Sequence, residues 1–147
     1  MLDVGGGYHV ADTPHLVMLA AGAAVPLRGS TDLSLWIHQN YLVAEDEGRR
    51  RSWKVRTTGY MFQLRVGERE LIAYHWHQRG LSPHTVPHVH LGPAAEIGFV
   101  DLARAHLPTG RICLADVLRL AIRDLGVEPR RDDWREVLDE ARPGGGA

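Results

Sequence analysis

Residues 73–93 read AYHWHQRGLSPHTVPHVHLGP, and the two His-x-His pairs in this stretch predict a β-hairpin. The stretch holds five of the nine histidines of the chain, namely His75, His77, His84, His88 and His90. Because residues two apart in a strand point to the same side, each pair would place both imidazoles on one face. We predict strands at residues 70–77 and 86–91, paired around residues 78–85, with the four strand imidazoles sharing one face.

Two longer strands are predicted upstream of this hairpin. Residues 31–44 alternate apolar and polar side chains, which is the period of a strand with one buried face. Residues 52–66 show the same alternation, but the apolar positions change parity at Gly59, where a β-bulge would reset the two faces. Gly67 and Glu68 then predict a tight turn into the first strand of the hairpin.

Helices are predicted on both sides of the strands. An Asp-Thr-Pro sequence ending at Pro14 combines a capping residue with a proline at the first helical position, which predicts a helix at residues 14–24. Apolar residues at helical spacing predict a second helix at residues 114–125. A third helix is expected to begin at Asp132 or Asp133.

Together these elements predict an α+β fold in a single domain spanning residues 1–147. The sheet would be a four-stranded antiparallel meander, because short connections favour antiparallel neighbours. One N-terminal helix and two C-terminal helices would pack on one face of that sheet.

The charge and the cysteine content restrict the class of protein. A formal net charge of −1 gives no electrostatic signature of a nucleic-acid or membrane surface. The single cysteine, Cys113, excludes an internal disulfide and indicates a reducing compartment. The apolar run at residues 16–25 is too short to span a bilayer. We expect a cytoplasmic protein whose partner is another protein and not a membrane; nucleic acid is not indicated by the charge but stays open as a substrate.

The histidines are the strongest chemical signal in the sequence. Neutral imidazole is the commonest metal ligand, and a zinc ion needs three or four such groups. The predicted metal ligands are His75, His77, His88 and His90, with zinc as the ion to expect. Further ligand candidates are His84, His106 and Asp101. The structural alternative is that these histidines are half-exposed and bond to neighbours or water.

A second chemistry needs no metal. One imidazole can accept a proton while another donates one, as in cleavage of the ribonuclease type. The histidines that we consider catalytic in such a site are His88, His90 and His106.

Two short patterns resemble metal sites of known families. The spacing His88-x-His90-x10-Asp101 resembles the ligands of the JAMM (MPN) metalloproteases, although Gly98 and Leu91 replace the serine and proline usual there. That resemblance implies a general-base glutamate, which could be any of Glu45, Glu47, Glu68 and Glu70. A cupin-like site would instead combine His88 and His90 with Glu96.

The segment around the cysteine resembles the ubiquitin-conjugating enzymes. The matching residues are Pro83, Pro87, Val89, His106, Pro108, Gly110, Ile112, Cys113 and Leu114. The resemblance implies a fold with a helix, a four-stranded meander and C-terminal helices, in which Cys113 forms a thioester and His106 is a nearby base or oxyanion donor. Leu107 separates His106 from Pro108, and no asparagine follows them. The alternative for a lone cysteine between isoleucine and leucine is buried packing.

Three functions therefore remain open. The first is conjugation through Cys113, or partner binding by an inactive relative. The second is a metal- or histidine-dependent hydrolase or nuclease, such as the toxin of a toxin–antitoxin pair. The third is a non-catalytic interaction domain. We hypothesise one polar site at the end of the hairpin strands, surrounded by His75, His77, His84, His88, His90, His106 and Cys113.

Overall fold

The computed structural model describes residues 11–29, 32–46, 52–77, 84–98 and 105–142, together with the backbone of residues 2–5. The strands are β1 (Leu2–Gly5), β2 (His15–Leu19), β3 (Val25–Pro26), β4 (Leu33–Glu45), β5 (Trp53–Val66), β6 (Arg69–His77), β7 (His88–Leu91) and β8 (Leu107–Pro108). The helices are α2 (Leu114–Asp124) and α3 (Trp134–Glu140), with short 3-10 turns η1 (Ala20–Gly22) and η2 (Pro93–Ala95).

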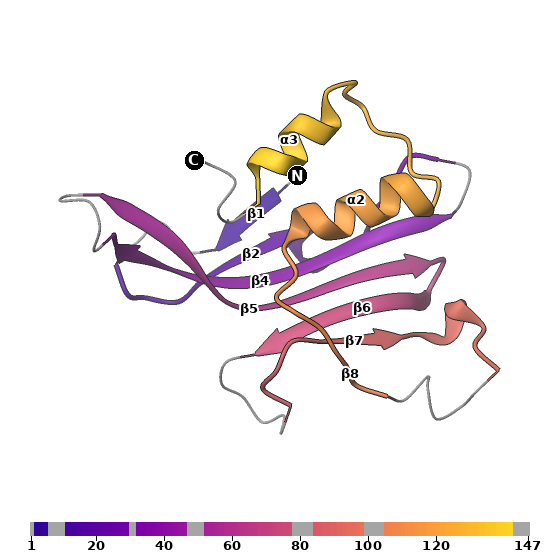
Figure 1. Cartoon of the computed structure of the whole chain (residues 1–147), viewed down its shortest axis with the longest axis horizontal. Coiled ribbons are helices and arrows are strands. Elements are labelled where there is room, and N and C mark those ends of the chain that lie inside the picture. The colour runs from indigo at the N-terminus through magenta and orange to yellow at the C-terminus, as the bar shows by residue number, and fades with distance from the viewer. Residues whose placement is uncertain are drawn as a thin grey trace.

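The strands form one antiparallel sheet in the order β1-β2-β4-β5-β6-β7-β8, with β3 paired to β4 beside this path (Figure 1). The pair of β4 and β5 is the longest and contains the bulge that the sequence predicts near Gly59. Asn40 pairs with Gly59 and Tyr41 with Thr57, so Thr58 has no partner on β4. The extra residue lies directly before Gly59, and the predicted change of face is confirmed.

One face of this sheet is covered by α2, and α3 lies on the same side (Figure 1). The largest fully buried side chains are Phe62 and Leu64 on β5 and Val117 on α2. They belong to one cluster with the inward residues of β4, which is the apolar set that alternation along the strands predicts. The backbone N–H of Ile112 donates to the Tyr60 hydroxyl at 3.0 Å, which ties the start of α2 to this face.

The C-terminal helices agree with the sequence. Helix α2 runs from Leu114 to Asp124, and Gly126 follows it with a left-handed φ of 73°, a conformation that glycine adopts without steric cost. Helix α3 begins after Asp133 and buries Leu138. Among the described residues no helix is long and apolar enough to cross a membrane.

The predicted four-stranded meander with an N-terminal helix is wrong. The meander of β4 to β7 is present, but it is the middle of a larger sheet, and residues 14–24 form β2 and η1 instead of a helix. β2 pairs with β1 on one side and β4 on the other, so tertiary hydrogen bonds outweigh the local helix signal. The chain then turns through Ala20 and Ala21 at positive φ, which an α-helix does not allow.

Three short strands were also not predicted. Residues 2–5 form β1, Val25–Pro26 form β3 against β4, and Leu107–Pro108 form β8 against β7. Each is at most four residues long, too short for its alternation to be distinguished from loop sequence.

Candidate metal centre

The register of β6 and β7 determines which side each histidine faces. His75 pairs with His88 and Ala73 with His90. Directly opposed residues of an antiparallel pair point to the same face, so the strand histidines share one side of the sheet. Tyr74 and Trp76 point to the other side, where they pair with the core residues of β5. The predicted hairpin with its imidazoles on one face is therefore confirmed, and that face is opposite the helices.

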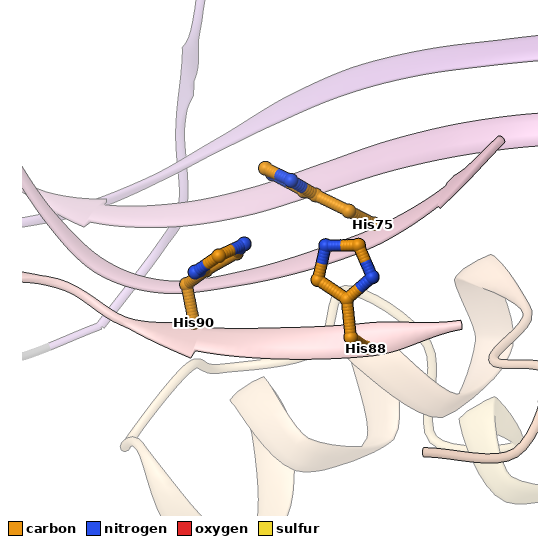
Figure 2. A group of neighbouring side chains, drawn as sticks. All are labelled: His75, His88 and His90. Carbon is orange, nitrogen blue, oxygen red and sulfur yellow. The ribbon is translucent and has the colours of Figure 1, made fainter. Parts of the chain in front are cut away.

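Three of these imidazoles converge (Figure 2). His75, His88 and His90 each offer a ring nitrogen, and these nitrogens all lie within 4.8 Å of one another. The ring centroids are 4.9 Å apart for His75 and His90 and 5.0 Å apart for His88 and His90. His77, a predicted fourth ligand, has its ring 6.2 Å from that of His75 and lies outside the converging group.

The local contacts orient the triad. The Nδ1 of His88 lies 2.8 Å from the carbonyl oxygen of Val86, which can only accept, so Nδ1 carries the proton and Nε2 keeps its lone pair. Such a bond on the far nitrogen is how proteins fix the tautomer of a ligating histidine. The Nε2 of His75 is buried and has no hydrogen-bond partner among the described residues. A metal ion would satisfy both lone pairs.

The electrostatics favour the neutral imidazole at two of the three converging histidines. Burial, and then the neighbouring His90 and His88, lower the pKa of His75 to about 4. Burial and then His106 also lower the pKa of His90. At neutral pH the lone pair of His75 is therefore available to a metal without displacement of a proton.

Two further histidines lie beside the triad. The rings of His84 and His106 stack with centroids 3.9 Å apart, and His106 lies 4.3 Å from His90 and 5.0 Å from His88. Both are exposed, and a slight desolvation, followed by the neighbouring His84 and His88, lowers the pKa of His106. The six histidines that the sequence groups into one site are thus brought together by the hairpin and by β8, although only three converge on one point.

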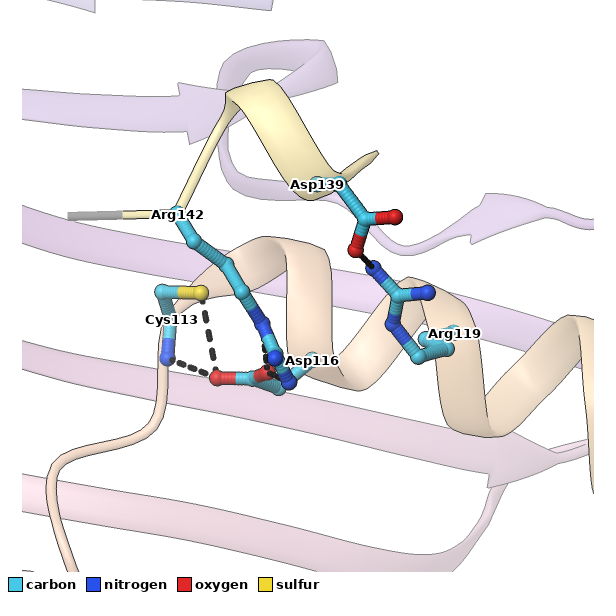
Figure 3. A network of polar contacts seen from close by, with 5 residues as sticks. All are labelled: Cys113, Asp116, Arg119, Asp139 and Arg142. Atoms are coloured by element: carbon cyan, nitrogen blue, oxygen red, sulfur yellow. Dashed lines mark hydrogen bonds and ion pairs between the residues drawn. The ribbon is translucent and has the colours of Figure 1, made fainter. Parts of the chain in front are cut away.

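Cys113 lies elsewhere. It is the N-cap of α2, on the helix side of the sheet, where its backbone N–H and its thiol both donate to Asp116, at 3.0 and 3.1 Å (Figure 3). Burial, and then the hydrogen bond to Asp116, raise the pKa of the thiol. The structure therefore separates Cys113 from the histidines, and its surroundings disfavour the thiolate. The thioester role stays a prediction without a supporting contact.

The carboxylates predicted as metal ligands or as a general base lie in different places. Asp101 and Glu47 lie outside the described residues, as does Pro83. Glu96 is 78% exposed and pairs with Arg69 at 3.7 Å. Glu45 is exposed and Glu68 is 98% exposed in its side chain.

Only one described carboxylate accompanies the triad. Glu70 is half-buried and lines a groove of about 470 Å³ together with His75, His90, Leu91, Gly92 and Pro93. Burial raises the pKa of Glu70, and Arg65 opposes that effect. Sequence patterns do not distinguish Glu70 from the other three glutamates, but its place in the groove does.

No protein-family model, no curated protein and no solved structure matches this chain. The resemblances to ubiquitin-conjugating enzymes, JAMM metalloproteases and cupins therefore stay predictions, and a function has to be argued from the site itself.

Proposed function

We propose that this protein is a zinc-dependent hydrolase whose metal ion is held by His75, His88 and His90. The observation that supports the proposal most strongly is the convergence of three ring nitrogens within 4.8 Å on neighbouring strands. Side chains on paired strands are held by the backbone ladder, which suits a site that has to keep its geometry.

The donor set fits zinc. Tetrahedral zinc has Zn–N bonds of about 2.0–2.1 Å, which places its ligand nitrogens about 3.3–3.4 Å apart. The triad would contract by up to about 1.5 Å to reach this spacing, which rotation of the side chains can supply. The fixed tautomer of His88 and the unpartnered Nε2 of His75 are both suited to such ligation.

The number of ligands found among the described residues suggests catalysis. Structural zinc sites are closed by four protein ligands, whereas catalytic ones use three and leave a position for water or substrate. A zinc ion in such a site polarises carbonyl or phosphoryl oxygens and lowers the pKa of bound water to about 7. The groove lined by His75 and His90 offers room for a substrate beside these two proposed ligands.

The test is the metal content of the tag-free protein, measured by inductively coupled plasma mass spectrometry. We expect about one equivalent of zinc per chain, lost in the His88→Ala/His90→Ala variant and in His75→Ala. The matched controls are His77→Ala, on the same strand as His75, and His38→Ala, two strands away on the same face; both should retain zinc.

Two outcomes would contradict the proposal. Protein that stays metal-free after dialysis against zinc would exclude it, and hydrolysis by such protein would support histidine acid–base chemistry instead. Zinc that persists in the His88→Ala/His90→Ala variant would show that the ion is bound elsewhere.

A further inference from the structure

The groove beside the triad contains a carboxylate at a position that the strand alternation would not give it. Arg65 on β5 pairs with Glu70 on β6, and Leu64 pairs with Ile72, so Leu71 is an extra residue without a partner. This is a second β-bulge, and a bulge changes the face on which the preceding side chain points.

The contacts on either side of the sheet show the effect of this bulge. Leu71 and Ile72 both contact the helix-side core. Glu70 lies with His75 and His90 along the groove, on the other side. With regular alternation Glu70 would share the face of Ile72 and Tyr74 and point into the apolar core. The bulge instead directs the carboxylate toward the predicted metal site.

Gly92 has no side chain, and Glu70 occupies the space that a side chain at this position would fill. It is buried opposite Glu70, and a Cβ at this position would lie 2.7 Å from the Cβ of Glu70 and 2.2 Å from its carbonyl oxygen. Any larger residue would force the strands apart or close this end of the groove. Leu91 and Pro93 are also among the residues that line the groove.

The groove is not built for an anion. None of the described residues that line it is an arginine or a lysine, the donors with which proteins hold phosphate. The arginines beside Glu70 in the sheet and in the chain have hydrogen-bond partners: Arg65, which pairs with Glu70, donates to the carbonyl of Glu68 at 2.9 Å, and Arg69 donates to the carbonyl of Pro93. Apart from the proposed metal ion, the described lining residues would offer a phosphate group the carboxylate of Glu70 and no cation, whereas an uncharged acyl group would not be repelled.

We infer that the groove binds an uncharged carboxylic ester or amide and that Glu70 is the catalytic base for its hydrolysis, an inference that rests on the proposed zinc function. Water attacks the carbonyl carbon, and Glu70 accepts a proton from that water as the new C–O bond forms. The bond between the carbonyl carbon and the leaving oxygen or nitrogen then breaks. Glu70 returns the proton to the leaving group, so that water and substrate give an acid and an alcohol or amine. The metal supplies polarisation of the carbonyl.

The geometry also indicates why Glu70 is a base and not a ligand. Its carboxylate is absent from the group whose donor atoms lie within 4.8 Å of one another, although it lines the same groove as two members of that group. A carboxylate that lines the groove without joining the ligands is free to accept a proton from the attacking water.

The experiment measures hydrolysis of p-nitrophenyl acetate by zinc-loaded protein, with bis(p-nitrophenyl) phosphate as the anionic comparison. We expect turnover of the acetate above that of His88→Ala/His90→Ala. Glu70→Gln should lower kcat about 100-fold with an unchanged zinc content and a KM within a few-fold, because general-base catalysis contributes about 10²–10⁴-fold. Glu70→Asp should restore part of kcat. Glu68→Gln, which removes an exposed carboxylate two residues away, should change neither constant.

The outcomes separate this inference from the zinc proposal. Zinc-loaded protein in which Glu70→Gln keeps kcat within twofold, or which turns over neither probe, contradicts the role of Glu70 but leaves the metal site intact. Preference for the phosphate probe contradicts the substrate class. Absence of zinc removes the proposed function itself, and the metal measurement detects that result independently.

Discussion

The two faces of β6 share one backbone but have opposite characters. On the helix side, Tyr74 and Trp76 lie against an apolar cluster that α2 closes. On the other side, Ala73 and His75 pair with His90 and His88, and no helix among the described residues covers them. The first face packs the sheet against the helices, and the second brings imidazole side chains together. Because side chains alternate along a strand, residues next to each other in sequence place core side chains on one face of the sheet and clustered imidazoles on the other.

The difference between the faces has an energetic basis. Apolar burial is non-directional and stabilises in proportion to area, so the helix face tolerates exchange among apolar residues of similar volume. The histidine face depends on lone pairs that point at one place, so its geometry matters more than its area. Residues that share no partner contribute additively to stability, and we expect the two faces to respond separately to substitution.

The largest change in the free energy of unfolding should come from a substitution on the helix face. Phe62 is 1% exposed, and truncating such a residue to alanine costs about 3–5 kcal/mol, so Phe62→Ala should strongly lower the midpoint of urea unfolding. Gln63→Ala, next in sequence on the opposite face, should change the free energy of unfolding by less than about 1 kcal/mol. Loss of zinc from Phe62→Ala under conditions where it remains folded would show that the two faces are coupled.

The second effect is a dependence of stability on pH that belongs to the histidine face. His75 has a folded pKa of about 4 against 6.5 when unfolded. Between these values the unfolded chain binds a proton that the folded chain does not. The stabilisation from neutral His75 is therefore complete above pH 6.5 and is lost as the pH falls toward 4. It amounts to at most about 3.5 kcal/mol, for a pKa lowered from 6.5 to about 4 at about 1.4 kcal/mol per pKa unit.

The measurement is urea unfolding of chelator-treated protein at pH 7, 5.5 and 4.5. His75→Gln removes the titrating group and should flatten the dependence, since acid effects common to both proteins cancel in the difference. Parallel curves for the two proteins would mean that His75 is solvated like a free imidazole.

The third effect is stabilisation by zinc. A ligand that binds only the folded state stabilises it by about 2.7 kcal/mol at 100 times its dissociation constant. Saturating zinc should raise the thermal midpoint of the wild type but not that of His90→Ala. His77→Ala should respond like the wild type, because His77 lies outside the converging group. An equal response of His90→Ala would place the ion away from the triad.

The sequence predicts the long strands and the histidine face because both depend on a period of two. Residues 33–45 and 53–66 are long enough for alternation to be distinct, and a glycine marks their bulge. The strand at residues 15–19 is different, since its apolar residues also fit helical spacing and a proline precedes it. Pairing with two neighbouring strands decided its conformation, and no local pattern contains that information.

The sequence predicts which residues belong to the candidate site better than it predicts how they are arranged. The spacing places His75, His88 and His90 on one face, but only the register shows that His77 lies beyond the point of convergence. Glu70 could not be chosen from the sequence. Its orientation comes from a bulge at Leu71, where no glycine marks the irregularity, unlike the bulge beside Gly59.

The smallest expected effect is on the reactivity of Cys113, on the helix face. The thiol of Cys113 donates to Asp116, and burial followed by this bond raises the pKa of the thiol. Because only the thiolate reacts, iodoacetamide at pH 8 should alkylate folded protein more slowly than protein unfolded in urea.

Asp116→Asn provides the sharper form of this test. Removing the carboxylate that accepts the thiol proton should lower the pKa of Cys113 and increase its alkylation rate several-fold. Asp139→Asn is the matched control, because Asp139 pairs with Arg119 and not with the thiol. If wild-type Cys113 reacts faster when folded than when unfolded, its environment favours the thiolate. The helix face would then hold a nucleophile as well as the core, and the thioester hypothesis would gain the support that the hydrogen bond to Asp116 now denies it.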